Sequence, residues 1–105
     1  MADAKERITQ GLTAMAQSRF ADALVAFEEV TRLEPENDQA WMGMAIAHER
    51  AGALDPAIDA IQRAIALQPT EPLHYTTLSR LFQKKGMKKE AEDAMARSFQ
   101  LSGGK

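Results

Sequence analysis

A step of 34 residues relates three stretches of this 105-residue chain to one another. The triplet Leu-Glu-Pro at 33–35 returns as Leu-Gln-Pro at 67–69, and Ala23, Ala57 and Ala91 share one register. Such a period is typical of a stacked array, in which each unit buries its apolar face against its neighbours. We therefore expect a single domain over 1–105 with a flexible tail at 102–105. Its units would be 4–37, 38–71 and 72–105.

Each unit has the apolar spacing of two helices joined by a short turn. In the second unit Trp41, Ala45 and His48 fall on one helical stripe, and Ile58, Ile61 and Ile65 form the next. The pattern gives no sign of a strand. The predicted fold class is therefore all-α, with six antiparallel helices. We expect them near 4–17, 20–33, 38–51, 54–67, 72–85 and 88–101.

The ends of these helices carry recognisable signals. Asp38 is placed to act as an N-cap, and Asp55 with Pro56 is placed to act as N-cap and first helical residue. Gly52 stands where a helix ends in a left-handed cap, and Gly86 holds the same register position. Gly43 lies inside a helix, where we expect it to let a ligand approach the backbone.

Composition narrows the class of protein. Apolar residues make up 45% of the chain and charged residues 27%, which is typical of a globular protein. The net charge is −2, so the chain as a whole is not suited to binding polyanions. There are no cysteines, which excludes disulfides and thiolate chemistry. With no apolar run long enough for a bilayer and no signal peptide at 1–7, we expect a cytoplasmic protein without membrane contact.

The repeated residues resemble the tetratricopeptide repeat family across essentially the whole chain. That pattern has large residues at repeat positions 4, 7, 11 and 24 and small ones at 8, 20 and 27. The resemblance implies a right-handed superhelical solenoid of three helix-turn-helix repeats. The second unit supplies Trp41, Met44, Ala45, His48, Ala57, Ile61, Ala64 and Pro69, and the third supplies Tyr75, Leu78, Ser79, Phe82, Ala91, Met95 and Ser98.

The two end units depart from this pattern in a way that suits an array end. The first unit has Arg7 and Gln10 where the others have large apolar residues. The last unit has Lys88 and Glu92 at positions that are apolar in the first two units. Polar end faces prevent an array from polymerising. We nevertheless expect Phe99 to be less well covered than its equivalents, because no further helix follows in this sequence.

The resemblance also implies where a partner binds, namely on a concave surface lined by the first helix of each unit. The third unit holds 7 basic and 3 acidic residues, so the groove is expected to become basic towards that end. A peptide or amphipathic helix with apolar anchors and an acidic stretch would fit such a groove. The expected contacts are the apolar Ile8, Leu12, Met15, Met42 and Ile46 and the basic Arg50, Arg80 and Lys84.

These residues leave other functions open. A tilt of the first helix would bury Ile8 and Leu12, and the same apolar surface would also serve a homo-oligomer or a secretion-type chaperone that shields an apolar helix. The lysines around Gly86, which are Lys84, Lys85, Lys88 and Lys89, fit a solvated turn better than a binding site. The carboxylate clamp of chaperone-tail binders is not expected. Its five positions hold Ile8, Leu12, Gly43, Leu73 and Thr77, none of which matches.

We predict that this chain does not catalyse a reaction and that it has no cofactor or metal site. His48 occupies a packing position, and His74 is expected to be exposed near a helix start. Neither has a second ligand at helical metal spacing. Nucleic-acid binding is also not expected, because the aromatic residues Trp41, Tyr75 and Phe82 fall in packing positions and leave no stacking platform.

Overall fold

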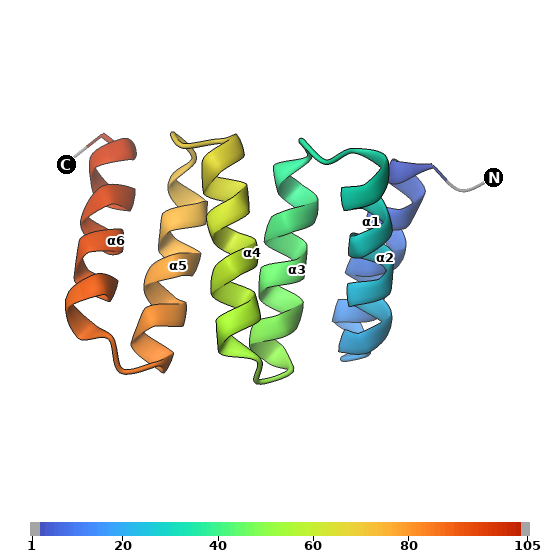
Figure 1. Ribbon diagram of the computed structural model, residues 1–105, viewed down its shortest axis with the longest axis horizontal. Coiled ribbons are helices and arrows are strands. Elements are labelled where there is room, and N and C mark those ends of the chain that lie inside the picture. The colour runs from blue at the N-terminus through green and yellow to red at the C-terminus, as the bar shows by residue number, and fades with distance from the viewer. Residues whose placement is uncertain (1–2, 104–105) are drawn as a thin grey trace.

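The computed structural model describes residues 3–103, and over this range the chain forms six α-helices. They alternate in direction, so that each predicted unit is one antiparallel hairpin (Figure 1). Every helix boundary lies within one residue of its predicted position. The predicted tail falls partly outside the described residues, and Ser102 and Gly103 form a turn. The helices are α1 (Ala4–Ala16), α2 (Phe20–Leu33), α3 (Asp38–Arg50), α4 (Leu54–Leu67), α5 (Pro72–Lys84) and α6 (Lys88–Leu101).

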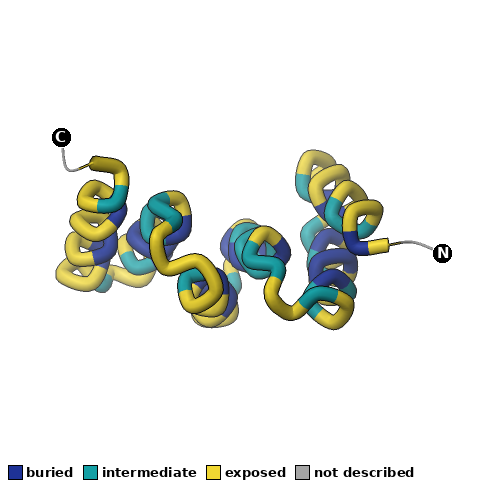
Figure 2. Tube along the Cα trace, turned by 90° about the horizontal axis from the view of Figure 1, so that it is seen from above, coloured by how far each residue is buried: buried dark blue, intermediate teal, exposed yellow. Residues whose placement is uncertain are grey.

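The hairpins form a single row measuring 44 × 26 × 20 Å. Each helix packs against the next one in the chain, and α1 also touches α3. Figure 2 shows buried residues along the lines where neighbouring helices meet and exposed residues on the outer sides. The apolar core is therefore a chain of local clusters. Its most constant members are Ala23, Ala57 and Ala91, which are buried where the two helices of each hairpin face each other.

Phe27 joins the first hairpin to the second. Its side chain is 1% exposed, and the ring lies between Gly11 of α1 and Gly43 of α3. A Cβ atom at either glycine would lie only 2.7 Å from ring carbons of Phe27. The expectation that Gly43 faces a ligand is therefore wrong, because its open side is already filled by Phe27. Both glycines are needed for the close approach of an aromatic ring to two helix backbones.

In the turn within each hairpin, the residue at the same repeat position has a left-handed backbone conformation. Gly52 and Gly86 have φ of +84° and +79°, which confirms the predicted cap at Gly52. Ser18 holds the equivalent place in the first hairpin with φ of +60°, a conformation that is costly for a residue with a side chain. The 34-residue register thus fixes the turn conformation even where the sequence does not supply glycine.

Two predicted N-caps are one or two residues out of place. Asn37, not Asp38, caps α3, because its side-chain oxygen accepts the N–H of Ala40 at 3.3 Å. Helix α4 begins at Leu54, ahead of Asp55, because Leu54 packs against the central apolar cluster and draws the first turn forward. Pro56 is tolerated there, since N–H groups of a first turn have no partner within the helix.

Aromatic residues at repeat position 4 tie the hairpins to the loops that precede them. The indole N–H of Trp41 donates to the carbonyl of Pro35 at 3.0 Å. The hydroxyl of Tyr75 donates to the carbonyl of Pro69 at 3.2 Å, in the same register. Each ring also carries a guanidinium from the second helix of its own hairpin over its face. These are Arg63, 5.2 Å from the centre of the Trp41 ring, and Arg97, 6.0 Å from that of Tyr75.

Replacing Gly43 by alanine tests the contact with Phe27. Alanine gains about 1 kcal/mol of helix propensity over glycine. We nevertheless expect Gly43→Ala to lower the free energy of unfolding by about 1–3 kcal/mol, because the new methyl group overlaps the ring. Urea denaturation would measure it. In a Phe27→Leu background the loss should largely disappear. A plain stabilisation by Gly43→Ala in the wild-type background would contradict this account.

The strained turn gives a reciprocal test. Ser18→Gly should stabilise the protein by about 0.5–1 kcal/mol, because glycine adopts a positive φ without steric cost. Gly52→Ser should destabilise it by a similar amount, since a Cβ there meets no atom within 4 Å and only the backbone conformation is penalised. Thermal unfolding of the two variants would measure both shifts. Equal signs for the two would refute the equivalence of the turns.

Candidate functional site

The eight predicted contact residues lie on α1, α3 and α5, and we call the side of the array formed by these helices the first-helix face. Successive contacts on each helix are three or four residues apart, which places them on one stripe. Leu12 is the most open of the apolar ones, with 59% of its side chain exposed. Ile8, Met15, Met42 and Ile46 are half-buried, and Arg50, Arg80 and Lys84 are exposed.

Part of the predicted apolar surface also supports the core. Ile8 packs against the cluster of Ala4, Val30 and Ala40, while Met15 and Met42 pack against other clusters. These three residues therefore contribute to packing as well as to the surface. Their stems are held by the array and only their outer atoms face solvent. A partner would meet a shallow apolar strip, with Leu12 as the one long side chain that stands out from it.

A carboxylate that sequence reasoning did not single out organises the basic end of this face. Glu49 of α3 is buried, with 5% of its side chain exposed. Arg80 of α5 grips it with two donors, Nε to Oε2 at 2.7 Å and Nη2 to Oε1 at 2.8 Å. Lys84, one turn further along α5, places Nζ 2.9 Å from Oε2. Two cations of the third hairpin therefore converge on one anion of the second.

This pairing changes the predicted role of the basic residues. The sequence suggested that Arg80 and Lys84 were free to meet a ligand, but both are already bound to Glu49. The pairing could not be anticipated, because Glu49 is separated from Arg80 by 31 residues and the contact depends on how α5 sits against α3. Lys84 and Arg80 keep about half of their side-chain surface exposed, so they still face solvent on their outer sides.

The cluster stays ionised over a wide pH range. Hydrogen bonding from Arg80, opposed by burial and supported by Lys84, lowers the pKa of Glu49 to about 2. The same contact raises the pKa of Arg80. Bidentate arginine–carboxylate pairing of this kind is strong because both partners are charged and the geometry matches. Glu49 is thus an anion at neutral pH, and it holds two cations in place.

These residues surround a hollow between α3 and α5. Its volume is about 370 Å³, and it is lined by Ile46, Glu49, Arg50, Arg80 and Lys84. Three cations and one carboxylate leave the lining with a net charge of +2, with an aliphatic side chain at one edge. Four of these five residues were among the predicted contacts. The arrangement can receive an acidic group beside an apolar one.

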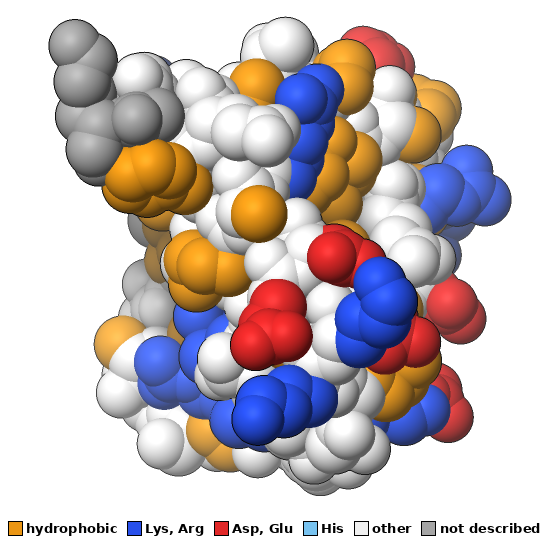
Figure 3. All heavy atoms as spheres, turned by 90° about the vertical axis from the view of Figure 1, so that its left-hand side faces the viewer, with side chains coloured by type: hydrophobic (Ala, Val, Ile, Leu, Met, Phe, Trp, Pro, Cys, Tyr) orange, Lys and Arg blue, Asp and Glu red, His pale blue; other side chains and the backbone are white. Residues whose placement is uncertain are grey.

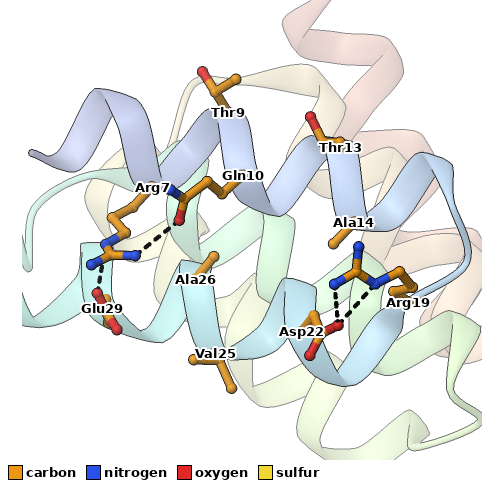
Figure 4. Close-up of a pocket in the computed structure, with 10 residues that line it drawn as sticks. All are labelled: Arg7, Thr9, Gln10, Thr13, Ala14, Arg19, Asp22, Val25, Ala26 and Glu29. Carbon is orange, nitrogen blue, oxygen red and sulfur yellow. Dashed lines mark hydrogen bonds and ion pairs between the residues drawn. The ribbon is translucent and has the colours of Figure 1, made fainter. Parts of the chain in front are cut away.

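A second hollow of about 370 Å³ lies between α1 and α2 at the N-terminal end of the row (Figure 4). Arg7 bridges it by bonding Glu29 at 2.7 Å and Gln10 at 2.9 Å, and Arg19 pairs with Asp22 along its other edge. The hollow exists because Ala14 stands where the other hairpins have His48 and Phe82. Its cations are already paired, so it offers a ligand no free charge. This hollow was not predicted from the sequence.

His74 is fully buried, which corrects the expectation that it is exposed. Its Nε2 lies 2.8 Å from a carboxylate oxygen of Asp38. Because Pro72 starts α5, the third residue of the helix points back at the first residue of α3. The pair therefore joins the second hairpin to the third.

Among residues 3–103, no group of three or more histidine, aspartate or glutamate side chains is arranged to hold a metal. No helix within 3–103 is both long and apolar enough to cross a membrane.

Comparison with known sequences identifies relatives of this chain. The model of the family described as tetratricopeptide repeat matches residues 8–72. Superkiller protein 3 of Schizosaccharomyces pombe is 31% identical over 61 residues, which is 58% of this chain and 4% of that protein. The chain therefore corresponds to a small part of that relative.

Solved structures share the fold at low sequence identity. A crystal structure of MamA superposes with a TM-score of 0.91 at 18% identity, covering 95% of this chain and 58% of the MamA chain. The type III secretion chaperone SycD of Yersinia enterocolitica, solved with a peptide of the translocator YopD, gives a TM-score of 0.92 at 18% identity. That match covers 96% of this chain and 77% of SycD.

Replacing Glu49 by glutamine should weaken the joint between the second and third hairpins. A carboxyl whose pKa is lowered on folding stabilises the protein above its unfolded pKa, and the effect is lost as pH falls from about 4.5 to about 2. We expect Glu49→Gln to cost on the order of 2 kcal/mol at pH 7 and to flatten the stability profile between these pH values. Denaturation at a series of pH values would measure both effects. The exposed Glu28→Gln should change neither, and an unchanged profile for Glu49→Gln would refute the assignment.

Proposed function

Because the chain belongs to the tetratricopeptide repeat family, we propose that it is a protein-interaction module that binds a segment of another protein on its first-helix face. The role is that of an adaptor, scaffold or co-chaperone. The hollow between α3 and α5 is the observation that carries this proposal. It combines a net positive lining with an aliphatic edge, and it lies on the same face as the exposed Leu12.

The chemistry of the face defines the ligand we propose. An aspartate or glutamate of the partner would lie against Arg50 and the outer sides of Arg80 and Lys84. Glu49 holds the last two in place, so little side-chain freedom would be lost when the ligand binds. An apolar side chain of the same segment would contact Ile46 or Leu12. Electrostatic complementarity would set specificity, while apolar contact would supply most of the affinity.

The relatives support this proposal in general terms. The SycD structure contains a bound peptide, and SycD is described as a secretion chaperone. We keep a chaperone that shields an apolar helix as a form of the same function, because such a helix also presents apolar anchors to a groove. We propose action in the cytoplasm and without catalysis, as expected from the sequence.

A peptide-display selection tests the proposal and requires no candidate partner. Random 16-residue peptides would be selected on immobilised wild-type protein and counter-selected on the double variant Leu12→Asp with Ile46→Asp. Enriched peptides should combine an apolar residue with aspartate or glutamate. Their affinity, measured by fluorescence anisotropy, should fall at least tenfold for the double variant, because two carboxylates replace apolar contacts and repel the acidic ligand.

Matched variants separate loss of binding from loss of structure. The double variant should keep the helicity and melting temperature of the wild type, since Leu12 is exposed and Ile46 is half-buried. Arg50→Glu should weaken the selected acidic peptides, whereas Arg32→Glu, an exposed change on α2, should not. Peptides that bind the double variant as tightly as the wild type would refute the proposed surface. Unfolding of that variant would show that these residues belong to the core.

A further inference from the structure

The cations of the hollow between α3 and α5 are only partly used within the protein. Arg80 donates from Nε and Nη2 to Glu49, which occupies one edge of its guanidinium group. Because a guanidinium has five N–H groups, three remain on the edge formed by the two Nη atoms. Lys84, with Nζ 2.9 Å from Glu49, keeps at least two of its three N–H groups. The two side chains that hold the buried anion can therefore hold a second one on their outer side.

Arg50 brings a third cation to the same hollow from α3. It lies one turn after Ile46 on this helix, just as Lys84 lies one turn after Arg80 on α5. The Arg50 side chain is exposed and adds five N–H groups. Three cations from two helices thus surround a volume of about 370 Å³, which is within the usual range for sites of small chemical groups.

Charge balance distinguishes between the anions that could enter. The lining has a net charge of +2. A single carboxylate of a partner carries one negative charge and two oxygens, so it leaves half of this charge unmatched. A phosphate monoester carries a charge of about −1.5 to −2 at pH 7 and has three acceptor oxygens. It therefore matches the lining in charge, and arginine forks suit its geometry.

The other positive charges of the third hairpin are distributed differently. Lys89 lies 3.6 Å from Asp93, and Lys85 pairs with Asp55. Figure 3 views the C-terminal end of the row and shows lysine and arginine side chains next to aspartate and glutamate side chains. That end also exposes 52% of Phe99, in line with the sequence prediction. The excess of positive charge that a phosphate needs is thus found in the hollow.

We propose that the hollow between α3 and α5 recognises a phosphorylated serine or threonine in the partner segment. This inference rests on the proposed function, because it names the acidic group that the first-helix face receives. The phosphate lies between Arg50, Lys84 and the outer edge of Arg80. Glu49 is a positioning residue, since it fixes Arg80 and Lys84 from below. Phosphorylation of the partner then switches its binding on.

The residues beside the phosphate set the sequence around it. Ile46 lies one turn from Arg50 on α3, at a Cβ distance of about 5–6 Å. In an extended peptide, residues two positions apart point to the same side and are separated by about 6.6 Å. An apolar residue two positions from the phosphorylated one would therefore contact Ile46. Serine and threonine are short enough to keep the peptide backbone close to the hollow.

Two peptide libraries test the inference. Degenerate nine-residue peptides would carry phosphoserine at the centre in one library and glutamate in the other, and both would be labelled with fluorescein. In fluorescence anisotropy the phosphoserine library should bind at least tenfold more tightly. Peptides retained on the immobilised protein should be enriched in apolar residues two positions from the phosphoserine.

The outcomes separate this inference from the proposed function. Equal or tighter binding of the glutamate library would overturn the phosphate assignment and leave the peptide-binding face standing. Absence of binding by both libraries would also overturn it, and the peptide-display selection would then decide separately whether the face binds any segment. Displacement of the phosphopeptides by a single-stranded RNA at equal phosphate concentration would overturn it in favour of nucleic-acid binding.

Variants of the hollow locate the phosphate. Arg50→Gln should weaken the phosphoserine library at least tenfold with unchanged helicity and melting temperature, because Arg50 is exposed. Arg50→Lys should recover only part of the loss, since lysine keeps the charge but lacks the fork. Arg32→Gln, an exposed change on α2, should bind like the wild type. Unchanged affinity in Arg50→Gln would refute the proposed position.

A pH series tests whether the doubly charged phosphate is the bound form. The second pKa of phosphoserine is about 6, so affinity should fall about fourfold between pH 7.5 and 5.5. The pKa of Glu49 is about 2, and this carboxylate therefore stays ionised throughout. The glutamate library should show no comparable fall, because a free glutamate has a pKa of about 4.3. A phosphopeptide affinity that does not change over this range would contradict the charge match.

Discussion

Small side chains set the distance between helices throughout this array. Ala23, Ala57 and Ala91 are buried where the two helices of a hairpin face each other, and Gly11 and Gly43 admit the ring of Phe27 between hairpins. Close approach fixes the angle of each helix, because interiors are densely packed and a single methyl group is felt. The alignment of α1, α3 and α5 along one side follows from it, and so does the hollow between α3 and α5. The candidate site is therefore a product of core geometry.

The two joints between hairpins are held by different forces. The first depends on Phe27 and is apolar. The second is rich in charge, since His74 binds Asp38, Arg80 and Lys84 bind Glu49, and Lys85 binds Asp55. The basic third unit identified in the sequence is attracted across this joint by Asp38, Glu49 and Asp55 of the second. The positive charge of the third unit is thus partly neutralised within the molecule. Only the remaining positive charge is exposed on the first-helix face.

The period and the placement of apolar residues were enough to predict six helices to within one residue at each end. Local signals were less decisive, because Asn37 and not Asp38 caps α3, and Asp55 lies inside the first turn of α4 and does not cap it. The burial of His74 and the pairing of Glu49 were missed, since each joins residues more than 30 positions apart. Such contacts depend on how one helix is rotated against another, and a repeat pattern does not specify that rotation.

Trp41 gives this molecule a built-in optical reporter. It is the chain's one tryptophan, and its indole is bonded to a loop carbonyl and covered by Arg63 in the middle hairpin. Arrays in which each unit contacts only its neighbours open most readily at their ends. Emission from Trp41 therefore follows the central unit alone, whereas circular dichroism sums the helices of all three. The separation between the two melting curves is a direct reading of how cooperatively the array unfolds.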